Sequence, residues 1–324
     1  MTTIIDVAKK AGVSKSTVSR VVSKNGYVSD ATRQKIEQAM DDLGYIPNML
    51  ARNLQSGLTK TIAFISHDFN QYTSIFLNTF TKTALKYDFY VNLYVTAGDK
   101  EKELDALNLM KYKQVDAVFI FTRSNSWDDI KPYRKYGPIS TWHRIDSPDI
   151  YSSYVNQYDS YLMSLEFLLS RGYKNIGHIL GYKNNKNTLA RINALNYFYE
   201  RHPELEKKEE WIFLNAKPYQ IGRNIAKKWH ETSNRPDCLV FYTDFIAAEC
   251  ISELQLLGYS IPKDIGIMGF DNNAISEIIH LTTVDCHLET QATNCFNYLY
   301  SELKNSTFSP IPIIQELVIR SSTK

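Results

Sequence analysis

Four side chains near the N-terminus have the chemistry needed to read the edges of DNA bases. Lys15, Ser16, Ser19 and Arg20 fall near the outer face of one short predicted helix. Arginine and lysine can donate paired hydrogen bonds to guanine, and serine hydroxyls can reach bases or phosphate oxygens. A short helix with such side chains on its exposed N-terminal half suits the DNA major groove, so the pattern predicts a recognition helix.

The spacing of apolar residues predicts the elements that position this helix. Apolar residues recur at helical spacing over 4–11 and resume over 18–22, with Gly12 between the two runs. Thr3 can cap the first helix, and Asp6 can complete the cap three positions later. Because glycine readily adopts a positive φ, Gly12 lets the chain turn sharply into the second helix.

A third helix is predicted to complete a small helical unit. Ser14 can cap the second helix, and Asn25-Gly26 marks the turn that follows it. Ser29 is the expected cap of the third helix, and Gly44 is expected to close it. Three short helices around an apolar core indicate a DNA-binding headpiece, although this spacing alone also fits an ordinary N-terminal helical bundle.

The N-terminal segment resembles the headpiece of the LacI/GalR family of bacterial repressors. Ser23 stands where the family has Asn after the recognition helix, which is a minor departure. The matching motifs, in the family's order, are Thr3-Ile4-Ile5-Asp6-Val7-Ala8, Gly12-Val13-Ser14, Thr17-Val18-Ser19-Arg20-Val21, Val28-Ser29, Leu43-Gly44-Tyr45-Ile46-Pro47-Asn48 and Ala51-Arg52-Asn53-Leu54.

The resemblance implies further DNA contacts after the headpiece, in a hinge helix at Met49–Ser56. A helix that short is marginal in water, so we expect it to fold only when DNA and a partner subunit hold it. Leu54 would wedge between base pairs in the minor groove; an ordinary flexible linker is the alternative. The expected DNA-binding residues are Thr3, Ser14, Lys15, Ser16, Thr17, Ser19, Arg20, Asn25, Tyr27, Ser29, Asn48, Ala51, Arg52 and Leu54.

Composition favours a cytoplasmic protein with a nucleic-acid partner. The net charge of the 324 residues is +2, but residues 1–60 carry +4 and the remainder carries −2. The basic excess therefore lies where DNA contact is expected. We find no apolar run of the ~18 residues that a membrane span needs, no secretory signal and no Cys-x-x-Cys spacing. We expect a bacterial, nucleoid-associated protein with reduced cysteines and neither metal nor cofactor.

From Thr61 onward the pattern changes to short apolar strands alternating with helices. Such alternation predicts parallel, doubly wound α/β sheets, and the number of strands predicts two lobes. The expected strands are Thr61–Ser66, Tyr90–Val95, Ala117–Phe121, Ile176–Leu180, Trp211–Leu214, Leu239–Tyr242 and Ile265–Phe270. The expected helices include Ile75–Tyr87, Lys100–Tyr112, Asp159–Arg171, Arg191–Arg201, Gly222–Thr232 and Phe245–Leu257.

In the LacI/GalR family a two-lobed fold like that of periplasmic sugar-binding proteins follows the headpiece. The expected fold class is therefore α/β, with an all-α helix-turn-helix headpiece before two doubly wound lobes. The expected boundaries are 1–46 for the headpiece, 47–60 for the hinge and 61–324 for the two-lobed domain, with lobe one at about 61–158 and 289–317 and lobe two at about 159–288 and 318–324.

Ligands of open α/β sheets bind beyond the carboxyl ends of the strands, so polar and aromatic residues there are candidates. Asp271 could instead cap the turn after its strand, Arg191 could form a surface salt bridge, and Trp142 could belong to the core. Several candidates match pocket positions of the family, but Asn156-Gln157 replaces the family's usual Asp-Asn pair. The expected ligand-binding residues are Asp68, Tyr72, Trp142, His143, Asn156, Asn187, Arg191, Asp244 and Asp271.

These features lead to the expectation of a homodimeric repressor of carbohydrate-utilisation genes. It would bind a palindromic operator, and a ligand between its lobes would control the affinity. Aromatic rings with Asp, Asn and Arg suit a sugar, while a purine or another effector is the alternative. A sugar-binding transport protein and a DNA-associated enzyme fit less well, because the first has no use for a headpiece and we find no catalytic motif for the second.

Overall fold

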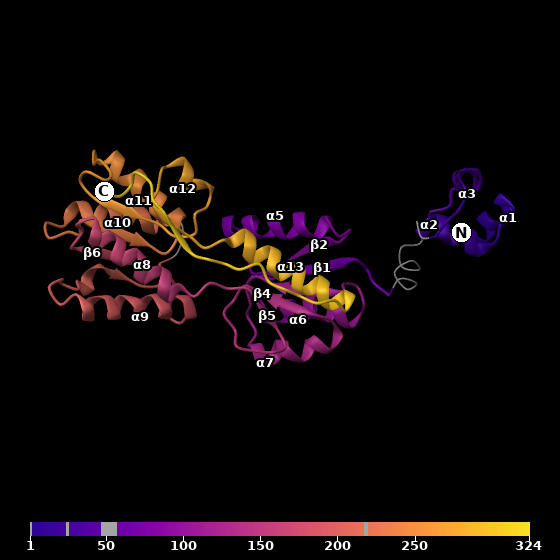
Figure 1. Ribbon diagram of the computed structural model, residues 1–324, viewed down its shortest axis with the longest axis horizontal. Coiled ribbons are helices and arrows are strands. Elements are labelled where there is room, and N and C mark those ends of the chain that lie inside the picture. The colour runs from indigo at the N-terminus through magenta and orange to yellow at the C-terminus, as the bar shows by residue number, and fades with distance from the viewer. Residues whose placement is uncertain (1, 24–25, 47–56, 217–219) are drawn as a thin grey trace.

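The computed structural model describes residues 2–23, 26–46, 57–216 and 220–324 (Figure 1). It contains an N-terminal helical unit and two parallel β-sheets, each covered by helices on both faces. The expected hinge helix and the expected DNA contacts Asn25, Asn48, Ala51, Arg52 and Leu54 lie outside the described residues.

Three helices form the headpiece: α1 (Ile4–Ala11), α2 (Lys15–Ser23) and α3 (Asp30–Asp42). They share a small apolar core in which Val7, Val18 and Ile36 are fully buried. The helix-turn-helix order predicted from apolar spacing is therefore confirmed.

The predicted caps of the headpiece are also confirmed. Thr3 and Asp6 form a reciprocal capping box at the start of α1, and Ser29 accepts from the Thr32 backbone at the start of α3. Gly12 ends α1 with φ of 66°, in the left-handed region where a Cβ atom is strained. This turn sets the direction in which α2 leaves α1.

The first lobe is built on a five-stranded parallel sheet of order β2-β1-β3-β4-β5. Helices α5 (Gln71–Leu85) and α13 (Leu288–Lys304) pack on one face through a cluster of phenylalanines. Helix α6 (Lys100–Lys111), α7 (Trp127–Ile130) and the 3-10 turn η1 (Lys131–Tyr136) cover the other face. The strands are β1 (Thr61–Ser66), β2 (Tyr90–Val95), β3 (Ala117–Ile120), β4 (Ile139–Thr141) and β5 (Tyr151–Ser152).

The second lobe is built on a four-stranded parallel sheet of order β7-β6-β8-β9. Helices α8 (Gln157–Ser170) and α9 (Lys186–Arg201) cover one face, and α10 (Ile221–Glu231) and α11 (Asp244–Leu256) cover the other. The remaining elements are β6 (Ile176–Ile179), η2 (Glu209–Trp211), β7 (Ile212–Phe213), β8 (Cys238–Phe241), β9 (Gly266–Met268) and α12 (Ala274–Ile278).

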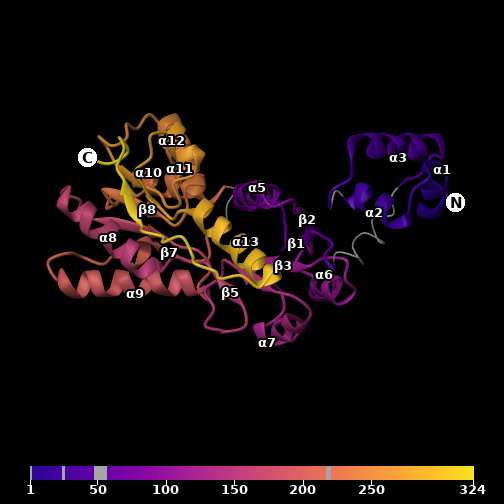
Figure 2. The same cartoon turned by 45° about the vertical axis from the view of Figure 1, so that its right-hand side comes forward.

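The chain passes between the two sheets three times, so the lobes share their connections (Figure 2). It crosses after β5, returns between β10 (Thr283–Asp285) and α13, and crosses again before β11 (Glu316–Val318). Strands β10 and β11 pair antiparallel beside the second sheet. The C-terminal tail stays there, because the Ile267 backbone N–H donates to the carbonyl oxygen of Ser322.

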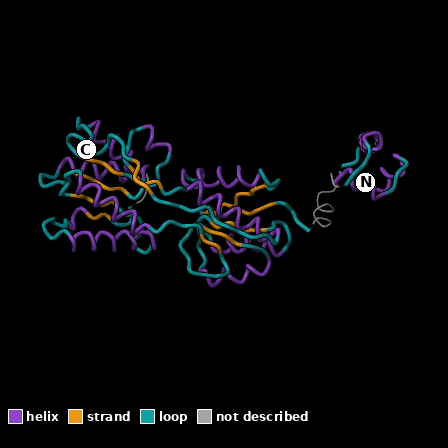
Figure 3. The backbone as a smooth tube through the Cα atoms, in the orientation of Figure 1, coloured by secondary structure: helices purple, strands orange, loops and turns teal. Residues whose placement is uncertain are grey.

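Several short elements differ from the sequence prediction (Figure 3). Strand β7 is limited to Ile212–Phe213, because Trp211 completes the preceding 3-10 turn. Strands β4, β5, β10 and β11 were not predicted, since two or three residues are too few to show a period. Across the described residues, we find no helix both long and apolar enough to cross a bilayer. All four cysteines are buried thiols without disulfides.

Candidate functional site

The candidate DNA-reading surface lies on α2. Lys15, Ser16 and Arg20 are exposed, while Val18 and Val21 of the same helix are buried against the other two helices. The aliphatic stem of Arg20 lies close to Gly26, where an added Cβ atom would approach the Arg20 Cδ atom to 3.4 Å. A helix packed on the headpiece core thus presents a guanidinium and an ammonium group to solvent.

The other expected headpiece contacts differ in how available they are. Ser14 accepts from the Thr17 backbone at 3.1 Å, and its hydroxyl also hydrogen-bonds with those of Ser16 and Thr17. Tyr27 is 90% exposed, whereas Ser29 already caps α3. Thr3 is held in its capping box and Ser19 is half-buried.

The second candidate site lies at the junction of the two lobes, around Arg191 on α9. Arg191 is only 3% exposed, and its guanidinium stacks on the Phe270 ring at 4.1 Å. Both terminal nitrogens donate to the Tyr242 carbonyl oxygen at 3.3 Å. The buried Nε atom has no hydrogen-bond partner among the described residues. Arg191 is therefore not the surface residue of the alternative interpretation, and it has donor capacity left for a ligand.

Asp271 follows strand β9 and faces the first lobe. Its backbone has φ of 107°, which a non-glycine residue rarely adopts, and its N–H donates to the Val284 carbonyl oxygen at 2.9 Å. Its Oδ2 atom accepts from the Tyr72 hydroxyl at 2.6 Å. Burial raises the pKa of Asp271 to about 7, although Tyr72 and the Arg191 charge act to lower it. The side chain of Asp271 thus accepts from Tyr72 across the junction and from the Cys286 thiol within its own lobe, whereas Asn273 caps the following helix.

Asp244, at the start of α11, lies behind this junction and is fully buried. Its carboxylate accepts from the Thr283 hydroxyl at 2.6 Å and from the Asn273 backbone at 3.0 Å. Burial and the neighbouring Asp271 carboxylate raise the pKa of Asp244 to about 8. Gly269 leaves room for it, since a Cβ atom there would lie 2.2 Å from an Asp244 oxygen. Asp244 thus joins the start of α11 to the start of α12 and to the first residue of β10 (Thr283–Asp285).

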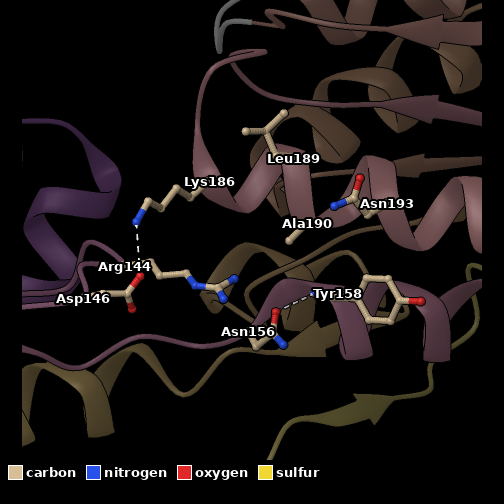
Figure 4. A pocket seen from close by; sticks show the side chains of 8 residues that line it. All are labelled: Arg144, Asp146, Asn156, Tyr158, Lys186, Leu189, Ala190 and Asn193. Carbon is tan, nitrogen blue, oxygen red and sulfur yellow. Dashed lines mark hydrogen bonds and ion pairs between the residues drawn. The ribbon is translucent and has the colours of Figure 1, made fainter.

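An open pocket of about 390 Å³ lies between α9 of the second lobe and the segment around Arg144 and Asp146 of the first lobe, and it shares no lining residue with the buried cluster (Figure 4). Figure 4 shows Lys186 of α9 reaching across to Asp146 of the first lobe, with 3.8 Å between the charged atoms. Asn156, predicted as a ligand residue, lines the pocket and also caps α8 through the Tyr158 backbone N–H. The other lining residues are Arg144, Tyr158, Leu189, Ala190 and Asn193.

The other predicted ligand residues are not brought into the cluster by any described contact. Asp68 is exposed and accepts from the Asn70 side chain. Trp142 stacks on Phe121 at 4.7 Å and donates to its carbonyl oxygen, so it packs into the first lobe. Asn187 lies in the first turn of α9, next to Lys186 of the pocket.

His143 follows Trp142 and is electrostatically unusual. Burial and the Arg123 charge lower the pKa of His143 to about 4, so its imidazole is neutral at physiological pH. Its buried Nε2 atom has no hydrogen-bond partner among the described residues. A neutral imidazole with a spare polar atom can donate or accept, depending on the tautomer.

Sequence reasoning missed several residues of the junction. Thr243 and Phe270 directly precede the predicted residues Asp244 and Asp271, and this adjacency could have identified them from the sequence. Arg144 and Lys186 lie in loops and helix starts whose position relative to the other lobe depends on the three crossings.

One further group combines two carboxylates and an imidazole. Asp285, His287 and Glu316 each bring one potential ligand atom to within 4.8 Å of the others. Asp285 already accepts from the Asn272 side chain and the His287 backbone, and Glu316 is exposed. We therefore assign no metal to this group.

Comparison with known proteins decides the family. The sequence model described as "Bacterial regulatory proteins, lacI family" matches residues 3–48, and that of a "Periplasmic binding protein-like domain" matches residues 165–323. The NTD biosynthesis operon regulator NtdR of Bacillus subtilis (strain 168) is 31% identical over 339 aligned residues, covering 100% of both chains. This chain belongs to the lacI family.

Further comparisons agree with membership of the lacI family. The transcriptional repressor PurR of Mannheimia succiniciproducens is 28% identical over 100% of this chain and 99% of its own. The Lac repressor dimer bound to operator and the anti-inducer ONPF has the same fold, with a TM-score of 0.82 at 21% identity over 99% of each chain. This lacI-family member is thus a DNA-binding transcriptional regulator, and these relatives are named as regulators rather than enzymes.

Proposed function

We propose that this regulator acts in the cytoplasm as a homodimer on a roughly palindromic operator, with its DNA affinity set by a small ligand between the lobes. One observation supports the ligand site above all: a buried guanidinium at the lobe junction, that of Arg191, keeps an unpartnered Nε atom. Such a group is costly to bury unless a partner completes its hydrogen bonds. The similarity to a Lac repressor dimer supports two copies on one operator.

The proposed ligand is a sugar. Asp271 can accept from a ligand hydroxyl, Arg191 can donate to one, and Asn156 lines the open pocket between the lobes. Neighbouring acceptors and donors of this kind suit a polyol, whose hydroxyls do both. A purine is the second candidate, because relatives that match the whole chain are named PurR.

The DNA contacts remain as the sequence suggested them. Lys15, Ser16 and Arg20 would read base edges in each half-site, and Leu54 from each subunit would wedge the centre of the operator open. Leu54→Ala should reduce both DNA bending and specific affinity without changing the melting temperature. Circular-permutation gel shifts measure the bend, and unaltered curvature would reject the wedge.

Three measurements test this proposal. Selection from a random duplex pool should yield a two-fold symmetric site whose affinity falls steeply with salt. A thermal-shift panel of glucose, sucrose, cellobiose, adenine, guanine and their nucleosides should identify one class that raises the melting temperature. Gel shifts with the stabilising compound then show whether it releases or tightens DNA. If the selection showed no sequence preference, the proposed operator binding would be wrong. If no sugar in the panel raised the melting temperature, the proposed sugar ligand would be wrong.

A further inference from the structure

The Tyr72 hydroxyl lies at the point where a ligand hydroxyl would meet the second lobe. Tyr72 projects from the first turn of α5, in lobe one, and its hydroxyl donates to Asp271 Oδ2 at 2.6 Å. The same hydroxyl hydrogen-bonds with that of Thr243. The ring meets Phe245 edge to face, with 5.7 Å between centroids. One side chain of the first lobe is thus held by three residues of the second.

The electrostatics of this contact keep Tyr72 a donor. Burial and the Asp271 charge raise the pKa of Tyr72 well above that of a free tyrosine, so the phenol stays protonated at physiological pH. The Asp271 backbone N–H donates to Val284, and the carboxylate itself also accepts from the Cys286 thiol, so both the backbone and the side chain are held. A ligand hydroxyl that takes the position of the phenol on Asp271 Oδ2 must therefore displace Tyr72.

We infer that Tyr72 is a specificity-determining residue, whose phenol fills the hydroxyl position on Asp271 until a ligand replaces it with an O–H donor of its own. This inference rests on the proposed ligand site between the lobes. It predicts that the site selects ligands by a hydroxyl group at this point, because a ligand without a donor would leave the Asp271 acceptor unpaired. The Tyr72 contact also joins the two lobes, so displacing it frees one lobe from the other.

The first test removes the phenol and offers it back as a small molecule. In Tyr72→Ala, added phenol should bind at least about threefold more tightly than benzene, which lacks the donor, as measured by melting-temperature titrations. Wild-type protein should show no such preference, because its own ring fills the space. In Tyr72→Ala/Asp271→Gly the preference should fall, since glycine accommodates the positive φ and removes the Asp271 acceptor, leaving only the Thr243 hydroxyl.

A second measurement keeps the test decisive if Tyr72→Ala does not fold. Tyr72→Phe keeps the ring and removes only the hydroxyl, so amide exchange over residues 271–276 should become roughly three- to tenfold faster. Tyr87→Phe is the matched control, because Tyr87 stacks on Phe296 and Tyr300 within its own lobe. Equal binding of phenol and benzene to a folded Tyr72→Ala would overturn the inference, as would exchange in Tyr72→Phe that matches Tyr87→Phe.

Neither measurement uses the effector. If no sugar or purine binds, the phenol and exchange results still report on Tyr72. If phenol shows no preference, the panel can still identify a ligand of the lobe junction. Failure of the inference and failure of the proposed function are therefore distinguishable.

Discussion

Arg20 is the side chain that we expect to contribute most to the recognition of the DNA sequence. It is exposed on a helix whose other face is buried in the headpiece core, so truncation should not disturb the fold. Arg20→Ala should cost about 1 to 3 kcal/mol at one base pair and relax the preference there. Binding-site selection with both proteins measures this change. The control is Lys35→Ala, which removes an equal charge from an exposed position of α3 and should leave the base preference intact. An unchanged preference in Arg20→Ala would show that Arg20 does not read a base.

Asp244 should make the stability of the second lobe depend on pH. Its pKa is about 8 in the folded chain, against roughly 3.9 for an unfolded aspartate, so the folded state holds the proton more tightly. The resulting stabilisation is complete below about pH 4 and is lost as the pH rises through about 8. Asp271, with a pKa of about 7, contributes in the same direction.

Asp244→Asn should flatten this dependence without emptying the site. The asparagine oxygen can accept from the Asn273 backbone, and its amide can donate to the Thr283 hydroxyl. Urea unfolding at pH 5 to 8, followed by the fluorescence of buried Trp211 and Trp229, measures the free energy of unfolding. If the free energy of unfolding depended on pH in the same way in both proteins, the raised pKa of Asp244 would be wrong.

At the scale of elements, the close contact between α10 and α11 depends on Gly222. A Cβ atom there would lie 2.4 Å from the Ile246 carbonyl oxygen and 2.6 Å from Glu249 Cβ. Helix propensity alone would make Gly222→Ala stabilising by about 1 kcal/mol, but overpacking should make it destabilising by about 1 to 3 kcal/mol. Asn224→Ala, at an exposed position of α10, is the control and should be neutral or slightly stabilising. Urea unfolding measures both variants. A Gly222→Ala protein more stable than the wild type would contradict the close contact.

The elements also show what the sequence alone could predict. Apolar spacing over six residues located β1 and β2, and cap residues located α1 and α3, because local interactions determine those features. Strand β4 has three residues and β11 pairs with a strand some 30 residues away, so their formation depends on the tertiary fold. In the candidate site, Arg191 and Asp271 follow from strand-end reasoning. The Tyr72 bridge does not, because it depends on how the two lobes close.

For the whole molecule, the proposed function requires that the lobe junction couple ligand to DNA through the relative arrangement of the lobes. Outside the three crossings, the described contacts between lobes include the Tyr72 hydrogen bonds and the exposed Lys186–Asp146 pair. An exposed ion pair contributes at most about 1 kcal/mol, so it cannot hold the lobes alone. A ligand shifts such an equilibrium only by the difference between its affinities for the two arrangements.

Arg191→Met should separate sensing from DNA binding. Methionine keeps an apolar stem against Phe270 but removes every donor, so the operator affinity without ligand should stay within about twofold while the response to the effector is lost. Arg201→Ala, at the exposed end of the same helix, is the matched control and should respond normally. A normal response from Arg191→Met would place the sensing contact elsewhere, because coupling through this junction requires that the ligand bind there.

Coupling between the two sites is also reciprocal. In the wild type, the factor by which effector changes operator affinity must therefore equal the factor by which operator changes effector affinity. Fluorescence-anisotropy and calorimetric titrations measure the two factors.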